Sequence, residues 1–217
     1  MWAKPVSMRV AIFISGRGSN MRRIVEDARL ASCPYEIALI CSNQQHSDGL
    51  HWAKEQNIPT FAFSLKGKDK DLVEEEISIE LKRHDVTMVA LAGYMRVLGD
   101  KFVQQWRGQL INVHPSLLPA YRGLNVHQRA LDDGVHFAGC SIHYVVEELD
   151  AGPIIAQGIR PVSAEETSCS LAEKLLPLEH ELYPRALRAL AHGHVQLDGM
   201  KAKIKPEVWN DLRLIQQ

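Results

Sequence analysis

The sequence predicts an α/β protein with a Rossmann-like, mostly parallel central sheet, helices on both faces and a mixed C-terminal half. Apolar runs alternate with helical patterns through the first half of the chain, which is typical of this class. The runs at 9–14, 35–41 and 86–92 are almost entirely apolar, as expected for strands that are covered on both faces. A turn with two glycines joins the first run directly to a helical pattern.

The first half is expected to contain strands at 9–14, 35–41, 60–63 and 86–92, and helices at 20–30, 49–56 and 71–83. In the helix at 71–83, we expect Leu72, Val73 and Ile79 to face the core. The acidic run Glu74 to Glu76 is expected to face solvent.

The second half has a different pattern, because the two extended strands expected at 137–146 and 154–160 follow one another without a helix between them. Strands are expected at 110–114, 137–146 and 154–160, helices at 126–133 and 168–192, and a hairpin at 195–197 and 202–204. We expect residues 1–7 to be a leader and residues 8–195 a single domain with lobes at 8–108 and 109–195. Residues 196–217 are expected to form a C-terminal hairpin and tail.

Composition narrows the class of protein. The 217 residues are 46% hydrophobic and 24% charged, and the formal net charge is −1, which argues against a dedicated nucleic-acid binder. No apolar run approaches the roughly 18 residues that span a membrane, and the N-terminus has no signal-peptide pattern. The four cysteines form no C-x-x-C pair. We therefore expect a cytoplasmic protein with reduced thiols and no membrane partner.

The glycine turn after the first strand predicts a phosphate site. Its sequence is Ser-Gly-Arg-Gly-Ser-Asn at 15–20, and Gly18, Ser19 and Asn20 are expected to hold the anion at the start of the helix. The Gly-Lys-Ser/Thr of a P-loop is absent, and Met21 stands where a dinucleotide fingerprint has its third glycine. A monophosphate is therefore favoured over a nucleotide.

A second polar cluster comes at the end of the strand 110–114. Asn112 and His114 are two residues apart, so their side chains lie on the same face, and Pro115 ends the strand. Ligands in α/β sheets bind outside such carboxyl ends. A protonated imidazole can donate to a developing oxyanion and then deliver a proton, and an amide can hold the same oxygen. The cluster therefore predicts a catalytic site.

The segment Asn-Val-His-Pro-Ser-Leu-Leu-Pro at 112–119, followed by Tyr-Arg-Gly at 121–123, resembles the signature of folate-dependent formyltransferases. Leu-Asp-Ala-Gly-Pro-Ile at 149–154 resembles the acidic loop of the same family. The glycine loop at 18–20 and the segment Leu-Ala-Gly-Tyr-Met-Arg-Val-Leu at 91–98 also match it. The resemblance runs from about residue 8 to about residue 183.

The resemblance implies transfer of a formyl group from the co-substrate 10-formyltetrahydrofolate to the amine of 5-phosphoribosylglycinamide in de novo purine biosynthesis, without a metal. The roles that it implies make His114 the proton donor and oxyanion partner, and Asn112 a second oxyanion donor. Asp150 would be the carboxylate beside His114, where it would raise the pKa of the imidazole.

The resemblance also implies binding residues. Gly18, Ser19 and Asn20 would hold the substrate phosphate, Gly93 and Glu179 would bind the rest of that substrate, and Lys70, Met95, Arg96, Val97, Leu98, Val145, Val146 and Glu147 would bind the folate. His143 is interpreted either as lining the cleft or as a packed strand histidine.

Three positions depart from the family pattern: Leu176 where Gln is common, Asn125 where His is usual, and Lys70 near an Arg that contacts the folate tail. The departures concern substrate contacts and leave Asn112, His114 and Asp150 intact. We expect a monomer or homodimer.

Three alternatives remain beside this interpretation. A methionyl-tRNA formyltransferase and a formyltetrahydrofolate deformylase share the core, but the resemblance implies an additional domain in each, for which we expect no room in 217 residues. A non-catalytic phosphosugar- or folate-binding module would not need the Asn, His and Asp set.

Overall fold

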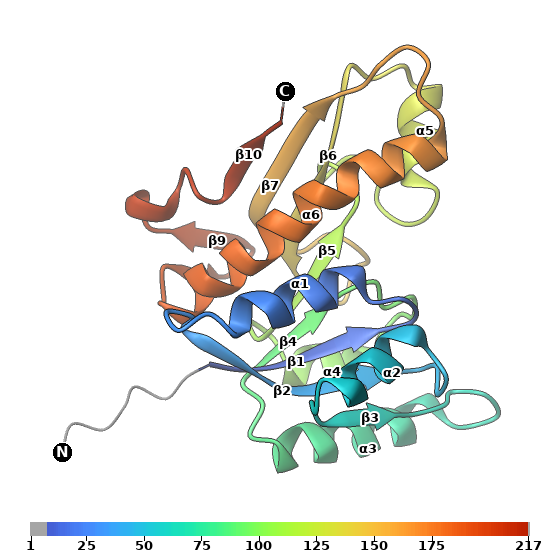
Figure 1. Cartoon of the computed structure of the whole chain (residues 1–217), viewed down its shortest axis with the longest axis vertical. Coiled ribbons are helices and arrows are strands. Elements are labelled where there is room, and N and C mark those ends of the chain that lie inside the picture. The colour runs from blue at the N-terminus through green and yellow to red at the C-terminus, as the bar shows by residue number, and fades with distance from the viewer. Residues whose placement is uncertain (1–7, 217) are drawn as a thin grey trace. The chain divides into compact units, whose positions relative to one another are not determined.

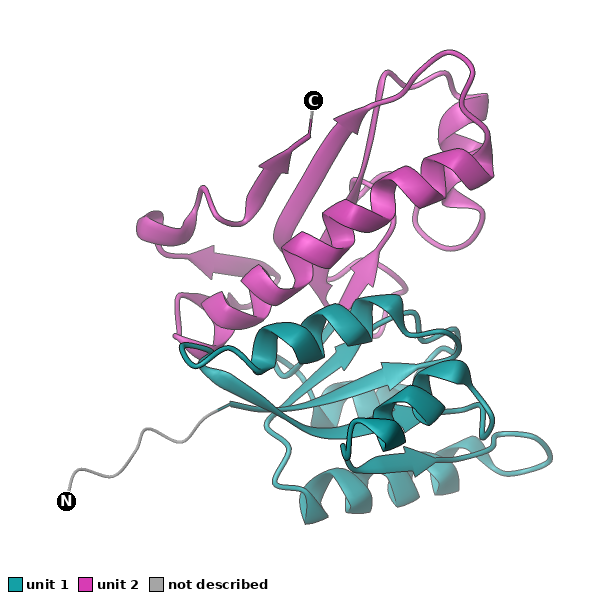
Figure 2. Cartoon of the chain, viewed as in Figure 1, with its two compact units in different colours: residues 1–111 teal, residues 112–217 magenta. Residues whose placement is uncertain are grey.

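The computed structural model describes residues 8–216 (Figure 1). The predicted leader at 1–7 and the last residue of the predicted tail, Gln217, lie outside the described residues. The chain divides between Ile111 and Asn112 into two compact units, which Figure 2 shows in separate colours. The division falls inside strand β5 (Leu110–His114). None of the helices in the described part of the chain is long and apolar enough to cross a membrane.

The first unit alternates strands and helices as predicted. Its elements before β5 are β1 (Met8–Ile14), α1 (Ser19–Ala28), β2 (Tyr35–Ser42), α2 (Asp48–Glu55), β3 (Thr60–Ala62), α3 (Lys70–Arg83), β4 (Met88–Leu91) and α4 (Asp100–Gln105). The strands lie in the order β4-β1-β2-β3 and all pair in parallel. Because the chain returns past β1 to form β4, the carboxyl ends of β1 and β4 flank a switch point in strand order, where ligands bind in such sheets.

The core of the first unit forms where the apolar runs predict it. Residues 10–14 of β1 are fully buried, and α1 packs Met21, Ile24 and Val25 inward. Right-handed crossovers between parallel strands put α1 and α2 on one face and α3 on the other. The runs are therefore apolar on both sides because both sides of the sheet are covered.

The predicted orientation of α3 is confirmed at Val73, which is buried, and at Glu75 and Glu76, which are exposed. It is wrong at Leu72, Glu74 and Ile79. Leu72 and Ile79 are 61% and 53% exposed, whereas Val73, Ile77 and Leu81 are buried. Glu74, predicted to face solvent, is only 6% exposed.

Glu74 lies inward because it makes a hydrogen bond that sequence periodicity cannot reveal. The Glu74 carboxylate accepts the backbone N–H of Gly99, the residue before α4, at 2.8 Å. Burial raises the pKa of this carboxyl group. The contact turns α3 so that one acidic residue lies inward. The helix α4 itself was not predicted.

The second unit has the predicted mixed pattern. After β5 come α5 (Val126–Asp132), β6 (Phe137–Tyr144), β7 (Ile154–Pro161), α6 (Ser168–Ala191), the strands β8 (Val195–Asp198) and β9 (Lys201–Ile204), the short 3₁₀ helix η1 (Pro206–Val208) and β10 (Arg213–Ile215). β6 and β7 are antiparallel, and β8 and β9 form the predicted hairpin. The helix α6 continues through Pro177 and Pro184, as expected.

The end of the chain is not only a tail. β10 pairs in parallel with β7, and the N–H of Gln157 donates to the carbonyl of Leu212 at 3.0 Å. The sequence pattern predicted no strand after the hairpin. β10 has only three residues, which are too few to show an alternating apolar pattern. Its pairing with β7 comes from backbone hydrogen bonds, which the sequence does not reveal.

Candidate active site

His114 lies buried at the end of β5, with 5% of its surface exposed. Its Nε2 is 2.9 Å from the carbonyl oxygen of Tyr121, and its Nδ1 is 3.4 Å from Oδ2 of Asp150. A carbonyl oxygen only accepts hydrogen bonds, so Nε2 is the donor in this contact. Nδ1, the other ring nitrogen, faces a carboxylate.

Asp150 joins two loops at this site. Its Oδ2, which faces His114, also accepts the backbone N–H of Gly123 at 2.9 Å. Its Oδ1 lies 3.8 Å from Nε2 of His143 and has no hydrogen-bond partner among the described residues. Asp150 has a φ of 50°, a left-handed conformation that Asp tolerates better than most residues. One carboxylate oxygen is thus held by the protein and the other remains available.

Asn112 is oriented by His143. The Nδ2 of Asn112 is 3.2 Å from Nε2 of His143, and Nδ1 of His143 donates to the carbonyl oxygen of Tyr144 at 2.8 Å. His143 is fully buried, and this burial lowers its pKa to about 4. The ring is therefore neutral at pH 7, and its Nε2 accepts a hydrogen bond from the Asn112 amide. His143 is packed, as one of the two interpretations held, and it also touches the predicted site.

Two serines hold the turn after β5: Ser116, which lies within the motif at 112–119, and Ser141, which no sequence pattern indicated. The hydroxyl of Ser141 donates to the carbonyl of Ser116 at 2.7 Å and accepts the N–H of Leu118 at 3.0 Å. The hydroxyl of Ser116 donates to the carbonyl of Ala120 at 2.6 Å. The last of these bonds fixes the residue before Tyr121, whose carbonyl oxygen accepts a hydrogen bond from His114. A lone serine in a buried strand, such as Ser141, offers no signal in sequence.

Positive φ values cluster around the same turn. Tyr121 has a φ of 56°, and Asn125, the residue before α5, has a φ of 54°. Asn accepts this conformation at little cost, which accounts for Asn125 in structural terms. Gly152 in the loop 147–153 is required for space, because a Cβ there would lie 1.7 Å from the carbonyl oxygen of Tyr144.

The glycine loop of the first unit suits an anion. Gly18 precedes α1 with a φ of 70°, and no side chain caps the helix. The first turn of α1 also contains no acidic residue. Its N-terminus therefore presents backbone N–H groups and the positive end of the helix dipole. Asn20 is buried in this first turn.

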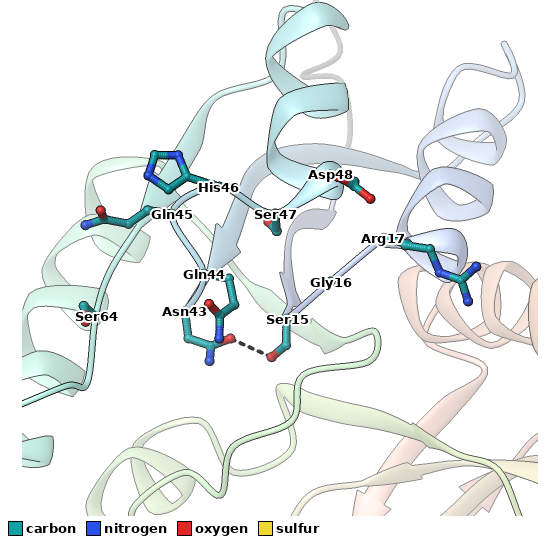
Figure 3. Close-up of a pocket in the computed structure, with 10 residues that line it drawn as sticks. All are labelled: Ser15, Gly16, Arg17, Asn43, Gln44, Gln45, His46, Ser47, Asp48 and Ser64. Atoms are coloured by element: carbon teal, nitrogen blue, oxygen red, sulfur yellow. Dashed lines mark hydrogen bonds between the residues drawn. The ribbon is translucent and has the colours of Figure 1, made fainter.

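A cavity of about 560 Å³ lies beside this loop, at the carboxyl ends of β1, β2 and β3 (Figure 3). It is lined by Ser15, Gly16, Arg17, Asn43, Gln44, Gln45, His46, Ser47, Asp48 and Ser64. The predicted phosphate residues at 18–20 are not among them. Within residues 8–216, no group of three or more His, Cys, Asp or Glu side chains could hold a metal ion.

The remaining predicted binding residues fall in both units. In the first, Gly93 has a φ of 75°, Met95 and Val97 are 67% and 65% exposed, and Leu98 is buried. Lys70 begins α3, with its Nζ 4.0 Å from a Glu74 carboxylate oxygen. In the second unit, Val145 to Glu147 follow β6, and Glu179 is half-buried on α6. The structure thus unites Asn112, His114 and Asp150 within the second unit.

His143 predicts a pH dependence of stability. Between about pH 6.5 and pH 4 the unfolded chain binds a proton at this residue and the folded chain does not, so the free energy of unfolding falls as pH falls. The expected loss from pH 7 to pH 4 is roughly 3 kcal/mol. Denaturant unfolding of the wild type and His143→Gln across this range measures it. Equal slopes in the two proteins would contradict the prediction, because all other titrating groups are shared.

Comparison with known proteins identifies the family to which this fold belongs. Residues 8–187 match the formyl transferase family, and the chain belongs to this family. A solved phosphoribosylglycinamide formyltransferase from Anaplasma phagocytophilum is 40% identical, with a TM-score of 0.89 over 96% of this chain and 98% of that chain. The predicted Rossmann-like α/β class is thereby confirmed.

Two further relatives bear on the activity. The human trifunctional purine biosynthetic protein adenosine-3 is 40% identical over 90% of this chain, and the chain spans only 19% of that relative's length. A solved formyltetrahydrofolate deformylase from Pseudomonas syringae is 28% identical, with a TM-score of 0.86 over 94% of this chain and 67% of that one.

Proposed function

We propose that this chain transfers a formyl group from 10-formyltetrahydrofolate to the amine of 5-phosphoribosylglycinamide, a step of de novo purine biosynthesis. The observation that carries the proposal is the arrangement of His114, with Nε2 held by the Tyr121 carbonyl and Nδ1 facing the carboxylate of Asp150. This arrangement supplies a positioned acid whose charged form has a counter-ion. The solved phosphoribosylglycinamide formyltransferase supports the choice of substrate, and the human relative, named for purine biosynthesis, supports the pathway.

The reaction begins when the substrate amine attacks the formyl carbon, and the carbonyl oxygen becomes an oxyanion. Asn112 has a second amide proton beyond the one that it gives to His143, and this proton is available to the oxyanion. Protonated His114 supplies the other positive partner through Nδ1–H, which is held only loosely by Asp150 at 3.4 Å. Both donors are set in place before the substrate arrives, so little reorganisation is needed as charge develops.

Collapse of the intermediate breaks the bond between the formyl carbon and N10 of the folate, and N10 takes up a proton. The attacking amine loses one proton. His114 delivers its proton to N10, and Oδ1 of Asp150 accepts the amine proton through a water molecule. Transfer of that proton from Asp150 to Nδ1 of His114 then restores both groups, so the protons balance over the cycle. Oδ1 suits this role because Gly123 and His114 both engage the other oxygen, Oδ2.

The proposal includes the binding residues that the likeness to the formyl transferase family implies for each substrate. The uncapped start of α1 with Gly18, Ser19 and Asn20 would hold the phosphate, and Gly93 and Glu179 would bind the rest of that substrate. Met95 to Leu98 and Val145 to Glu147 would bind the folate, with Lys70 toward its acidic tail. The cytoplasmic location and the monomeric or homodimeric state stay predictions.

A deformylase activity is the second candidate, favoured by the likeness to the solved deformylase. In that reaction water replaces the amine as nucleophile, and the same oxyanion donors serve. One experiment separates the two. Purified chain is mixed with 10-formyltetrahydrofolate and with 5-phosphoribosylglycinamide, initiator methionyl-tRNA or buffer alone, and release of the deformylated folate is followed.

We expect release that depends on 5-phosphoribosylglycinamide and matches formation of its N-formyl product one to one. Equal release in buffer alone would overturn the proposal in favour of hydrolysis. Release that requires the tRNA would overturn the assigned substrate.

A further inference from the structure

Ser15 connects three loops at the carboxyl edge of the first unit. It directly follows β1, and its backbone N–H donates to the carbonyl oxygen of Gly93, after β4, at 3.1 Å. Its hydroxyl oxygen is 2.6 Å from Oδ1 of Asn43, after β2, and 2.9 Å from the backbone nitrogen of Met95. Figure 3 shows the side chains of Ser15 and Asn43 directed toward one another at the cavity. Neither residue was predicted to belong to the site.

The chemistry of the three groups sets the direction of these bonds. An amide oxygen only accepts, so the single hydroxyl proton of Ser15 goes to Oδ1 of Asn43. The lone pairs of the same oxygen then face the N–H of Met95. A serine hydroxyl otherwise rotates freely. Asn43 therefore determines that Ser15 presents an acceptor, rather than a proton, to the segment 93–98.

Ser15 and the ring of Tyr94 both hold the start of that segment. The ring packs against Phe13 and Phe63, whereas Ser15 holds the backbone on either side of it. Met95 and Val97 are 67% and 65% exposed, so their side chains contribute little packing. Leu98 is buried at one end of the segment. At the other end, the two bonds from Ser15, one to Gly93 and one from Met95, hold the backbone. Gly93, with a φ of 75°, makes the turn between them.

We propose that Ser15 and Asn43 are positioning residues for folate binding, with Asn43 acting through the Ser15 hydroxyl to hold the backbone at 93–98. The inference rests on the proposed function, which assigns Met95 to Leu98 to the folate. Neither side chain is proposed to touch the reacting atoms. Their loss should therefore weaken folate binding and leave the chemical step unchanged.

The test compares Asn43→Ala with Asn43→Asp, which retains an acceptor oxygen for the Ser15 hydroxyl. Gln44→Ala is the matched control, because Gln44 lines the same cavity and its side chain makes no hydrogen bond within residues 8–216. We expect Asn43→Ala and Ser15→Ala to raise the KM for 10-formyltetrahydrofolate about 3- to 10-fold, the effect of one net hydrogen bond. The kcat and the KM for 5-phosphoribosylglycinamide should stay within about twofold of wild type, because the backbone N–H of Ser15, which every variant retains, still holds the carbonyl of Gly93.

Asn43→Asp and Gln44→Ala should behave as wild type. A purely structural role for Asn43 would instead lower thermal stability and disturb both KM values, and that outcome overturns the inference. An unchanged folate KM in Asn43→Ala overturns it as well.

Amide hydrogen exchange without any ligand separates this inference from the proposed function. The Met95 amide should exchange faster in Asn43→Ala and Ser15→Ala and at the wild-type rate in Asn43→Asp and Gln44→Ala. If the wild type transfers no formyl group but Met95 exchange responds as expected, the proposed function fails while the positioning of 93–98 stands. If exchange at Met95 is the same in all variants, the positioning role is overturned whatever the activity.

Discussion

Replacement of His114 with alanine is expected to lower kcat by about 10³-fold, within the range that positioned general acids contribute. The change removes both the donor to the oxyanion and the proton for the leaving nitrogen. The KM for either substrate should change little, because the ring acts on charge that exists only during the reaction. Steady-state rates with each substrate varied in turn measure the effect.

The variant also removes the shorter hydrogen bond of the Tyr121 carbonyl and leaves only the 3.5 Å contact from the Ser116 hydroxyl, so we expect a loss of about 1–3 kcal/mol in the free energy of unfolding. Assays well below the unfolding temperature keep the two effects apart. His136→Ala is the control, because this histidine is exposed in the same unit and should retain wild-type activity. A kcat for His114→Ala within a few-fold of wild type would remove His114 from the mechanism.

Asp150→Asn is expected to lower kcat roughly 100-fold by removing the carboxylate that stabilises protonated His114 and accepts the amine proton. Asparagine retains an oxygen that can accept the N–H of Gly123, and it tolerates the φ of 50° at this position. The variant therefore removes charge and preserves the loop contact. Its free energy of unfolding should therefore fall less than that of a variant that loses the contact with Gly123.

Asp150→Ala provides the comparison, because it removes the charge and the loop contact together. We expect it to be less stable than Asp150→Asn and at least as inactive. Full activity in Asp150→Asn, combined with inactivity in Asp150→Ala, would mean that residue 150 only holds the loop. Kinetics and denaturant unfolding of both variants, measured side by side, distinguish the two roles.

The regular elements of the fold were largely predictable because long apolar runs carry their own periodicity. β1, β2 and β5 lie where the sequence predicts them to within a residue. The errors arose where the pattern is short or where one contact decides the result. α4 and β10 are too short to show a period, and the buried hydrogen bond of Glu74 determines the face of α3.

The candidate site divides in the same way. Asn112, His114 and Asp150 were predicted because their spacing at a strand end and in a loop matches a family signature. Ser141, Ser15 and Asn43 were missed because each acts through hydrogen bonds to residues that are distant in sequence. Such a bond leaves no local pattern, and a serine after a strand is common in any sheet protein.

Local periodicity and short motifs were sufficient to predict the α/β class, the order of the main strands and helices, and the residues that we propose for the chemistry. The folded structure was needed to show which nitrogen of His114 faces Asp150 and which oxygen of Asp150 remains available. It also decided that His143 is neutral and directs the Asn112 amide. These properties depend on which groups meet in space at hydrogen-bond distance, and that information arises only when the chain has folded.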